Sequence, residues 1–125
     1  MHLPDPIVMV VDDDKSVRDA LARLLRSAGI RPQVFESAEK FLDESNLDDA
    51  GCLVIDVQMP GMRGLELQRI CVERCPGVPI VMMSAFTDDD AETRAIEAGA
   101  VAFLHKPFDA ASFLAMIRKM VNAEC

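Results

Sequence analysis

The stretch Cys52–Gly61 reads CLVIDVQMPG and decides the fold, because it sets an aspartate directly behind a short, continuous apolar run. A run of this length and composition is typical of a strand buried on both faces of a parallel sheet. A carboxylate at the end of such a strand is costly to bury unless another group pairs with it. The Pro60-Gly61 pair then turns the chain. The rest of the sequence therefore has to supply a partner for Asp56.

Similar apolar runs alternate with amphipathic helical patterns along the whole chain. The predicted strands are Ile7–Val11, Gln33–Phe35, Cys52–Ile55, Pro79–Met83 and Val101–Leu104. The predicted helices run from Asp14 to about Ala28, from Ser37 through Leu42, from Gly64 to Cys75, from Asp89 to Ala98, and onward from Asp109. Asp14, Ser37 and Asp109 are the expected N-caps, and Gly29 and Gly99 the expected stops.

Five βα units in succession predict an α/β fold, a doubly wound (βα)5 three-layer sandwich around a parallel sheet. The order 2-1-3-4-5 of the flavodoxin-like folds suits five strands. At 125 residues, without linker or repeat, residues 1–125 are expected to form one domain.

Composition narrows the classes of function. Thirteen Lys and Arg face 21 Asp and Glu, for a net charge of -8, which argues against direct binding of nucleic acid. No apolar run approaches the roughly 20 residues that span a bilayer, and the N-terminus does not resemble a signal peptide. We therefore expect a cytoplasmic protein with no membrane partner. The four cysteines lack the spacing of a zinc site and are expected to act as small apolar residues.

Acidic side chains follow the first and third predicted strands. In the order 2-1-3-4-5 these strands are neighbours, and ligands bind beyond their carboxyl ends. Asp12, Asp13 and Asp56 should therefore converge, and their mutual repulsion calls for a cation. A small open cluster of carboxylates favours Mg²⁺ over Ca²⁺. Taken alone, the triplet at 12–14 would more often be a capping and solvation cluster, as we expect for the triplet at 88–90, and its coincidence with Asp56 favours the cation site.

Ser84 and Lys106 follow the fourth and fifth predicted strands. A hydroxyl and an ammonium at the same sheet edge can bind an anion, although Lys106 alone could simply form a salt bridge. A metal, a hydroxyl, an ammonium and a carboxylate nucleophile are the groups that phosphoryl transfer requires. A carboxylate can itself accept the phosphoryl group as an acyl phosphate.

With these residues in place, the chain resembles the receiver domain of two-component response regulators over essentially its whole length. The matching motifs are VVDDDKS at 10–16, VIDVQMPGMRG at 54–64, MSAF at 83–86 and FLHKPF at 103–108. The surrounding SAEKFL and IEAGAVAFLHKPF are most similar to FixJ-type receivers. The resemblance implies a CheY-like fold and a cis bond before Pro107.

The resemblance also assigns roles to the matching positions. Asp56 would be the phosphoacceptor. The implied ligands of Mg²⁺ (or Mn²⁺) are Asp12, Asp13, Asp56 and the backbone carbonyl of Gln58, and the implied phosphate-binding and switch residues are Ser84, Lys106 and Phe103. Phe103 stands where tyrosine is frequent, and a plain core phenylalanine is the alternative for it.

The implied function is that of a self-phosphorylating signalling domain rather than an enzyme, with at most autophosphatase activity. Its donor would be a sensor histidine kinase. Phosphorylation would move the loop from Ser84 into the helix at 89–98, whose apolar residues are mostly small, with Ile96 as the expected large anchor. The alternative is a short surface helix without a regulatory role. The response would control an output partner, or a homodimer through this helix, the fifth strand and the fifth helix. Regulation of transcription is the expected output.

Three other classes compete with this interpretation. A degenerate receiver would act as an interaction module without phosphorylation, but all the expected site residues are present. A haloacid dehalogenase-type phosphatase needs Asp-x-Asp, and Gln58 occupies the second aspartate position. A flavodoxin-like flavin binder is disfavoured because the chain has no Trp or Tyr.

Overall fold

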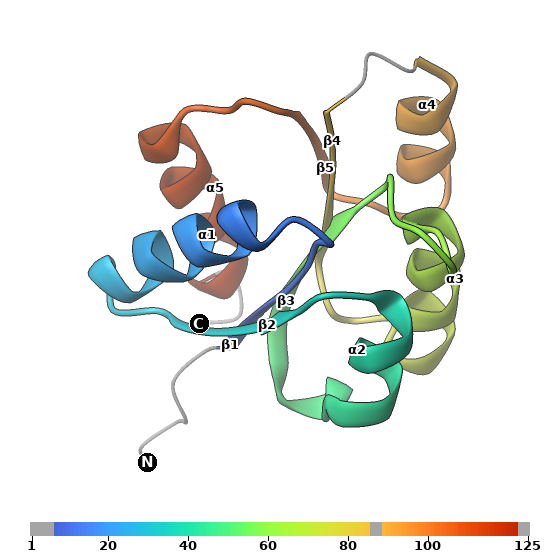
Figure 1. The fold of residues 1–125 in the computed structure, drawn as a ribbon, viewed down its shortest axis with the longest axis horizontal. Coiled ribbons are helices and arrows are strands. Elements are labelled where there is room, and N and C mark those ends of the chain that lie inside the picture. The colour runs from blue at the N-terminus through green and yellow to red at the C-terminus, as the bar shows by residue number, and fades with distance from the viewer. Residues whose placement is uncertain (1–6, 86–88, 123–125) are drawn as a thin grey trace.

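The structure, a computed structural model, describes residues 7–85 and 89–122. The strands are β1 (Ile7–Val11), β2 (Arg31–Phe35), β3 (Ala50–Asp56), β4 (Ile80–Ser84) and β5 (Ala102–His105). The helices are α1 (Lys15–Ser27), α2 (Ala38–Glu44), α3 (Gly64–Arg74), α4 (Asp89–Glu97) and α5 (Ala110–Asn122), with a short 3₁₀ helix η1 (Leu47–Asp49). Figure 1 shows α1 and α5 on one side of the sheet and α2, α3 and α4 on the other.

All the paired strands are parallel, and their order in the sheet is β2-β1-β3-β4-β5. The predicted doubly wound (βα)5 fold and its strand order are therefore confirmed. In the register, Val11 lies opposite Ile55, Asp56 opposite Met83, and Ser84 opposite His105. The carboxyl ends of the strands consequently meet at one edge of the sheet.

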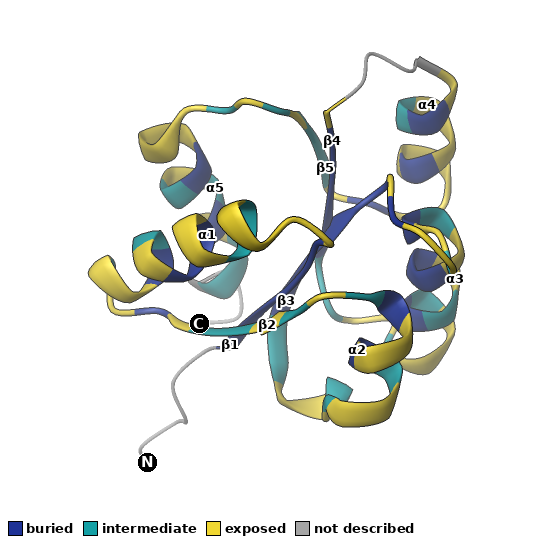
Figure 2. Cartoon of the chain, viewed as in Figure 1, coloured by how far each residue is buried: buried dark blue, intermediate teal, exposed yellow. Residues whose placement is uncertain are grey.

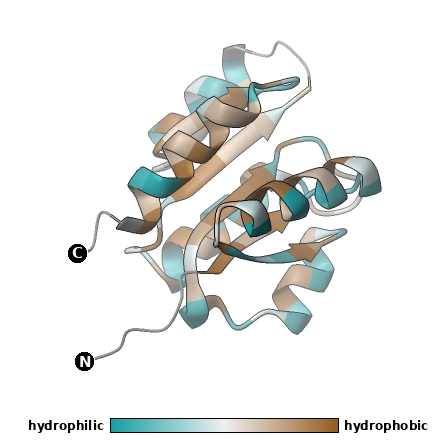
Figure 3. Cartoon of the chain, turned by 90° about the vertical axis from the view of Figure 1, so that its left-hand side faces the viewer, coloured by the Kyte–Doolittle hydropathy of each residue, from teal (hydrophilic) through white to brown (hydrophobic). Residues whose placement is uncertain are grey.

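The sheet separates two apolar layers, and its central strands are buried on both faces (Figure 2). Leu21 and Leu25 of α1 pack with Phe113 and Ile117 of α5 in one layer. Phe41 and the other buried residues of α2, α3 and α4 form the second layer. In Figure 3 the hydrophobic colours gather on the strands and on parts of the helices. Among the described residues, no helix combines the length and apolarity that crossing a membrane requires.

The predicted caps are present. Asp14 accepts from the backbone N of Ser16 over 2.8 Å at the start of α1, and Ser37 accepts from the backbone N of Lys40 over 3.0 Å at α2. Asp109 accepts from Ser112 in the first turn of α5 over 2.9 Å. Each carboxylate or hydroxyl satisfies an amide that the helix itself leaves unpaired. Local sequence signals were therefore sufficient to predict the N-termini of α1, α2 and α5.

Strand boundaries differ from the predictions by one or two residues. β2 begins at Arg31 rather than Gln33, β5 begins at Ala102 rather than Val101, and Asp56 belongs to β3 itself. A parallel ladder continues wherever backbone groups pair, so polar residues can belong to a strand. Phe86 of the MSAF motif, Asp88 of the second acidic triplet and Cys125, one of the four cysteines, lie outside the described residues.

The predicted anchor of α4 was wrong, although its packing through small apolar residues was expected. Ile96, the expected large anchor, has 46% of its surface exposed, whereas Ala91 and Ala95 are buried against the core. Small side chains let the helix backbone approach the core closely, and the residue after Ala95 then points away from it. α4 is therefore held by small contacts, so its packing rests on less apolar burial than a large anchor would provide.

Candidate functional site

Three carboxylates converge at the carboxyl edge of the sheet. Asp12 directly follows β1, Asp13 comes next, and Asp56 ends β3. One oxygen from each of the three lies within 4.8 Å of the other two. Asp12 is fully buried, Asp56 is 3% exposed, and Asp13 faces solvent. The predicted convergence of these side chains is confirmed.

Backbone and side-chain hydrogen bonds hold Asp12 in place. Its amide donates to the carbonyl of Phe35 at the end of β2 over 3.1 Å, and its Oδ1 accepts from the amide of Asp14 over 2.9 Å. Arg18 of α1 donates from Nη1 to the Asp12 carbonyl over 2.8 Å. Sequence reasoning missed Arg18, because nothing in the pattern separates it from an ordinary helix-surface arginine. The turn after β1 is thus held by β2, by α1 and by a hydrogen bond within the turn itself.

Lys106 completes the cluster from the segment after β5. Its Nζ lies 2.7 Å from Oδ2 of Asp12 and 3.6 Å from Oδ2 of Asp56. Its amide donates to the Ser84 carbonyl over 2.8 Å, which ties it to β4. The bond between Lys106 and Pro107 is cis, as the resemblance implied. A single ammonium therefore faces two buried carboxylates.

The other predicted residues lie around this cluster. Ser84 is the buried last residue of β4, and Gln58 is exposed, with its amide 3.3 Å from Oδ1 of Asp56. Phe103 is half-buried inside β5, opposite Met82, and its ring centre lies 5.2 Å from that of His105. Ser84 and Gln58 thus adjoin the acidic cluster, whereas Phe103 lies within the strand rather than at its end.

This geometry agrees with a comparison against protein families. The profile described as the response regulator receiver domain matches residues 8–118. The chain belongs to this family. The receiver is 40% identical over 118 residues to the response regulator protein TmoT of Ectopseudomonas mendocina, a match covering 94% of the receiver and 54% of TmoT. It is 41% identical over 111 residues to the transcriptional regulatory protein FixJ of Azorhizobium caulinodans, a match covering 89% of the receiver and 53% of FixJ.

Solved structures are similar over nearly the whole receiver. The response regulator StyR superposes with a TM-score of 0.86 at 45% identity, covering 97% of this chain and 62% of StyR. A CheY-like receiver of Methanospirillum hungatei superposes at 0.89 with 21% identity, covering 97% of each chain, which supports the fold alone. The chain spans about half the length of the curated relatives it matches.

The chemistry of the receiver's acidic cluster fits a divalent cation. Burial at the end of β3 and the negative charge of Asp12 raise the pKa of Asp56 to about 7, although Lys106 and the Gln58 amide oppose this rise. The cluster thus holds more negative charge than its own ammonium can compensate. The donors are all oxygens, and they line an open hollow of about 430 Å³, which suits a hard ion that keeps some water. An acidic triad of this kind is typical of receivers that bind Mg²⁺.

Gly64 is a site residue that the sequence placed only as the start of a helix. A Cβ built on it would lie 2.1 Å from the backbone oxygen of Asp56. The first turn of α3 therefore presses against the end of β3, and only glycine allows this approach. The motif ending in Gly64 could have suggested the constraint, but it does not reveal which atom lies opposite.

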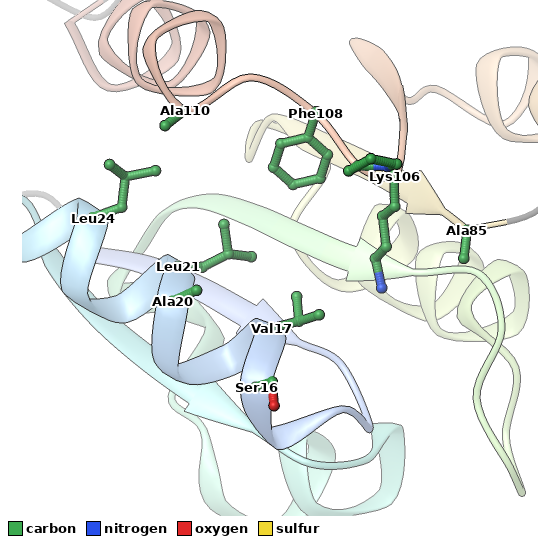
Figure 4. A pocket seen from close by; sticks show the side chains of 10 residues that line it. Ser16, Val17, Ala20, Leu21, Leu24, Ala85, Lys106, Phe108 and Ala110 are labelled. Atoms are coloured by element: carbon green, nitrogen blue, oxygen red, sulfur yellow. The ribbon is translucent and has the colours of Figure 1, made fainter.

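An apolar groove adjoins the acidic cluster. Its volume is about 640 Å³, and it lies between α1 and the segment that leads from β5 into α5. Figure 4 shows Val17, Leu21 and Leu24 of α1 facing Phe108 across it, with Lys106 at one end. Apolar surface of this kind beside a reactive site is suited to binding another molecule.

Proposed function

We propose that the receiver accepts a phosphoryl group on Asp56 from a sensor histidine kinase and changes its conformation in response. The observation that carries this proposal is the set of carboxylates of Asp12, Asp13 and Asp56 within 4.8 Å, with the ammonium of Lys106 beside two of them. A site of this kind can both supply a nucleophile and neutralise transferring oxygens. Family membership supports the same conclusion.

Asp12, Asp13, Asp56 and the backbone carbonyl of Gln58 would hold Mg²⁺, or Mn²⁺ in its place. The ion, when bound, supplies positive charge against the phosphoryl oxygens. Burial is the main cause of the raised pKa of Asp56, and the negative charge of Asp12 adds to it; a bound cation would offset this second cause. The three carboxylates that would supply oxygen ligands already lie together.

The protein's own groups perform the transfer. An oxygen of Asp56 forms a bond to phosphorus as the bond from phosphorus to the donor's histidine nitrogen breaks, and the histidine leaves. Asp56 attacks as a carboxylate, and the ammonium of Lys106, which lowers its pKa, helps to keep it ionised. With Nζ 3.6 Å from Oδ2 of Asp56, Lys106 can also bind the transferred group, and the hydroxyl of Ser84 can donate to it.

The donor has to approach this same edge of the sheet. The apolar groove between α1 and the segment that leads from β5 into α5 ends at Lys106 and offers the kinase a surface next to the acceptor (Figure 4). Val17, Leu24 and Phe108 line this groove. Binding there would hold the donor histidine close to Asp56 during transfer.

The response would travel through α4 and β5. His105 Nε2 lies 2.9 Å from Oε1 of Glu92, which joins β5 to α4, and α4 packs mainly through alanines. A new charge at Asp56, bound by Ser84 and Lys106, would shift these contacts, with Phe103 as the rotating aromatic. The output would be a homodimer through α4, β5 and α5, or an effector that controls transcription, in the cytoplasm and without direct contact with nucleic acid or membrane.

Intact mass after incubation with acetyl phosphate and Mg²⁺ tests this function. We expect one phosphoryl adduct on the parent protein and none on Asp56→Asn or after chelation of the metal. Asp43→Asn, a change at an exposed carboxylate of α2, is the matched control and should be labelled like the parent. An unlabelled parent would contradict the proposal and favour a phosphorylation-independent interaction module, whereas equal labelling of Asp56→Asn would mean that another residue accepts the phosphoryl group.

A further inference from the structure

We propose that Glu39 of α2 is a positioning residue for the acceptor site, because its carboxylate holds the loop that carries Gln58. This inference rests on the proposed function, in which the carbonyl of Gln58 is a metal ligand. Oε2 of Glu39 accepts from the backbone N of Met62 over 3.0 Å, across 23 positions of sequence. The bond therefore joins two elements that the chain connectivity does not hold together.

The loop at 57–63 approaches Glu39 closely at a second point. Gly61 has a φ of +76°, and a Cβ built on it would lie 2.7 Å from Oε2 of Glu39. The left-handed backbone of Gly61 and its missing side chain both allow the loop to lie against the carboxylate. Two adjacent loop residues thus meet the same side chain.

Glu39 also brings a negative charge near the start of α3, whose first turn already contains Glu66. Arg63 occupies the N-cap of α3 but makes no side-chain capping bond. Helix N-termini carry unpaired amides and a partial positive charge. The hydrogen bond from Met62, just before this N-terminus, lowers the pKa of Glu39, as expected for a carboxylate that accepts an amide proton. α2 therefore places a hydrogen-bonded carboxylate beside the residue that precedes the N-cap of α3.

The same loop joins directly to the acceptor. Its beginning is set by the amide of Gln58, 3.3 Å from Oδ1 of Asp56, and by the buried side chain of Met59. Its end is set by Gly64, which packs against the backbone oxygen of Asp56. Between Met59 and Gly64, the carboxylate of Glu39 forms a hydrogen bond to the loop from another element. Loss of this contact should loosen the backbone that presents the Gln58 carbonyl.

The test compares the full chain with Glu39→Ala, Glu39→Gln and Glu44→Ala. Glutamine keeps an oxygen that can accept from Met62 but loses the charge. Glu44 is an exposed glutamate near the other end of α2, so its removal controls for lost charge alone. Three quantities are measured: exchange of the Met62 amide without metal, the affinity for Mg²⁺ by calorimetry, and the rate of labelling by acetyl phosphate as Mg²⁺ is varied.

For Glu39→Ala we expect hydrogen exchange of the Met62 amide to be about tenfold faster, the change that loss of one ordinary hydrogen bond produces. We expect Mg²⁺ to bind about three- to tenfold more weakly, as for loss of a group that orients a ligand. The labelling rate at saturating Mg²⁺ should stay close to that of the parent, since Glu39 does not touch the reacting atoms. Glu39→Gln should recover most of both losses, and Glu44→Ala should resemble the parent.

Unchanged Mg²⁺ affinity in Glu39→Ala would overturn the positioning role, even if the protein were less stable. Equal effects of Glu39→Gln and Glu39→Ala, or a matching loss in Glu44→Ala, would reduce the effect to charge and overturn it as well. A parent that neither binds Mg²⁺ nor takes up phosphate would overturn the proposed function, and the metal-related role of Glu39 with it. The two failures are thus distinguished by the parent protein.

Discussion

The ammonium of Lys106 lies 2.7 Å from Oδ2 of Asp12, although the two residues are 94 positions apart in the sequence. Lys106 is nearer to this carboxylate than to that of Asp56, which lies 3.6 Å away. Asp12 is fully buried, so the ion pair with this ammonium compensates for its removal from water when no metal is bound. The pair is therefore structural in the metal-free receiver as well as part of the proposed acceptor site.

Removal of Lys106 should destabilise the protein mainly when metal is absent. In Lys106→Ala the carboxylate of Asp12 stays buried without its partner, and we expect a loss of about 2–4 kcal/mol in the free energy of unfolding with chelator present. Saturating Mg²⁺ should reduce this loss, because the ion replaces the missing positive charge, and Mg²⁺ should still bind. Urea unfolding in both conditions measures the difference.

Lys15→Ala is the matched control. Lys15 also forms a lysine–aspartate ion pair at 2.7 Å, but with Asp19 on the exposed surface of α1. Pairs of this kind contribute little to stability, so we expect a small effect that does not depend on Mg²⁺. If Lys106→Ala lost the same stability with and without Mg²⁺, the assigned role of the Asp12–Lys106 pair would be wrong.

Asp56→Asn should stabilise the metal-free protein at high pH. The pKa of Asp56 is raised to about 7 in the folded state, above the value of about 3.9 in an unfolded chain. The folded state therefore binds the extra proton, and stability falls as pH rises through this window. At pH values above the pKa of Asp56 in the folded state, we expect the free energy of unfolding of the variant to exceed that of the parent by about 2–4 kcal/mol. The difference should shrink as the pH falls toward the pKa of this residue in the unfolded chain.

Urea unfolding with chelator across this pH range measures the sign of the stability difference between Asp56→Asn and the parent. Asp43→Asn, at an exposed position of α2, should follow the parent throughout. Equal stability of Asp56→Asn and the parent above the folded-state pKa of Asp56 would mean that burial and neighbouring charges do not destabilise the ionised carboxylate.

Gly64→Ala should disturb the acceptor site through the backbone. The added Cβ would lie 2.1 Å from the oxygen of Asp56, so α3 or the end of β3 has to move. We expect a loss of about 1–3 kcal/mol in unfolding free energy, typical of overpacking, and slower labelling of Asp56. Gly77→Ala is the control, because a Cβ there meets nothing within 4 Å. Similar stability of the two variants would contradict the close contact.

Gln68 connects α3 to α4 through a buried amide. Its Nε2 donates to the carbonyl of Ala95 over 2.8 Å, and its Oε1 is buried without a hydrogen-bond partner in the described structure. Gln68→Leu removes the bond and the unsatisfied oxygen together, so global stability should change by no more than about 1 kcal/mol. Amide exchange in α4 should nevertheless become faster, because its end loses a contact with α3.

Mass spectrometry of exchanged peptides from α4 measures this effect. α1, on the opposite side of the sheet, supplies the internal reference, since its exchange should be unchanged. A uniform increase across both helices would indicate global destabilisation and would contradict a local role for Gln68.

Much of the fold could be predicted from local signals. The apolar runs, the caps at Asp14, Ser37 and Asp109, and the glycine stops all depend on neighbouring residues, and the structure confirms them. The strand order and the convergence of Asp12, Asp13 and Asp56 were also predicted, because parallel strands bring their carboxyl ends to one edge. The exposure of Ile96 was not predicted. The small side chains of α4 pack against the core, and the larger Ile96 faces away from it.

The amino-acid sequence by itself determined which elements form and which side chains reach the carboxyl edge of the sheet, because hydrophobic periodicity and capping act over a few residues. Only the tertiary structure decided how these side chains pair: Lys106 with Asp12, Arg18 with the Asp12 carbonyl, Glu39 with Met62 and Gly64 against Asp56. Such contacts join distant segments, and their geometry depends on how helices pack on the sheet. No local pattern contains that information.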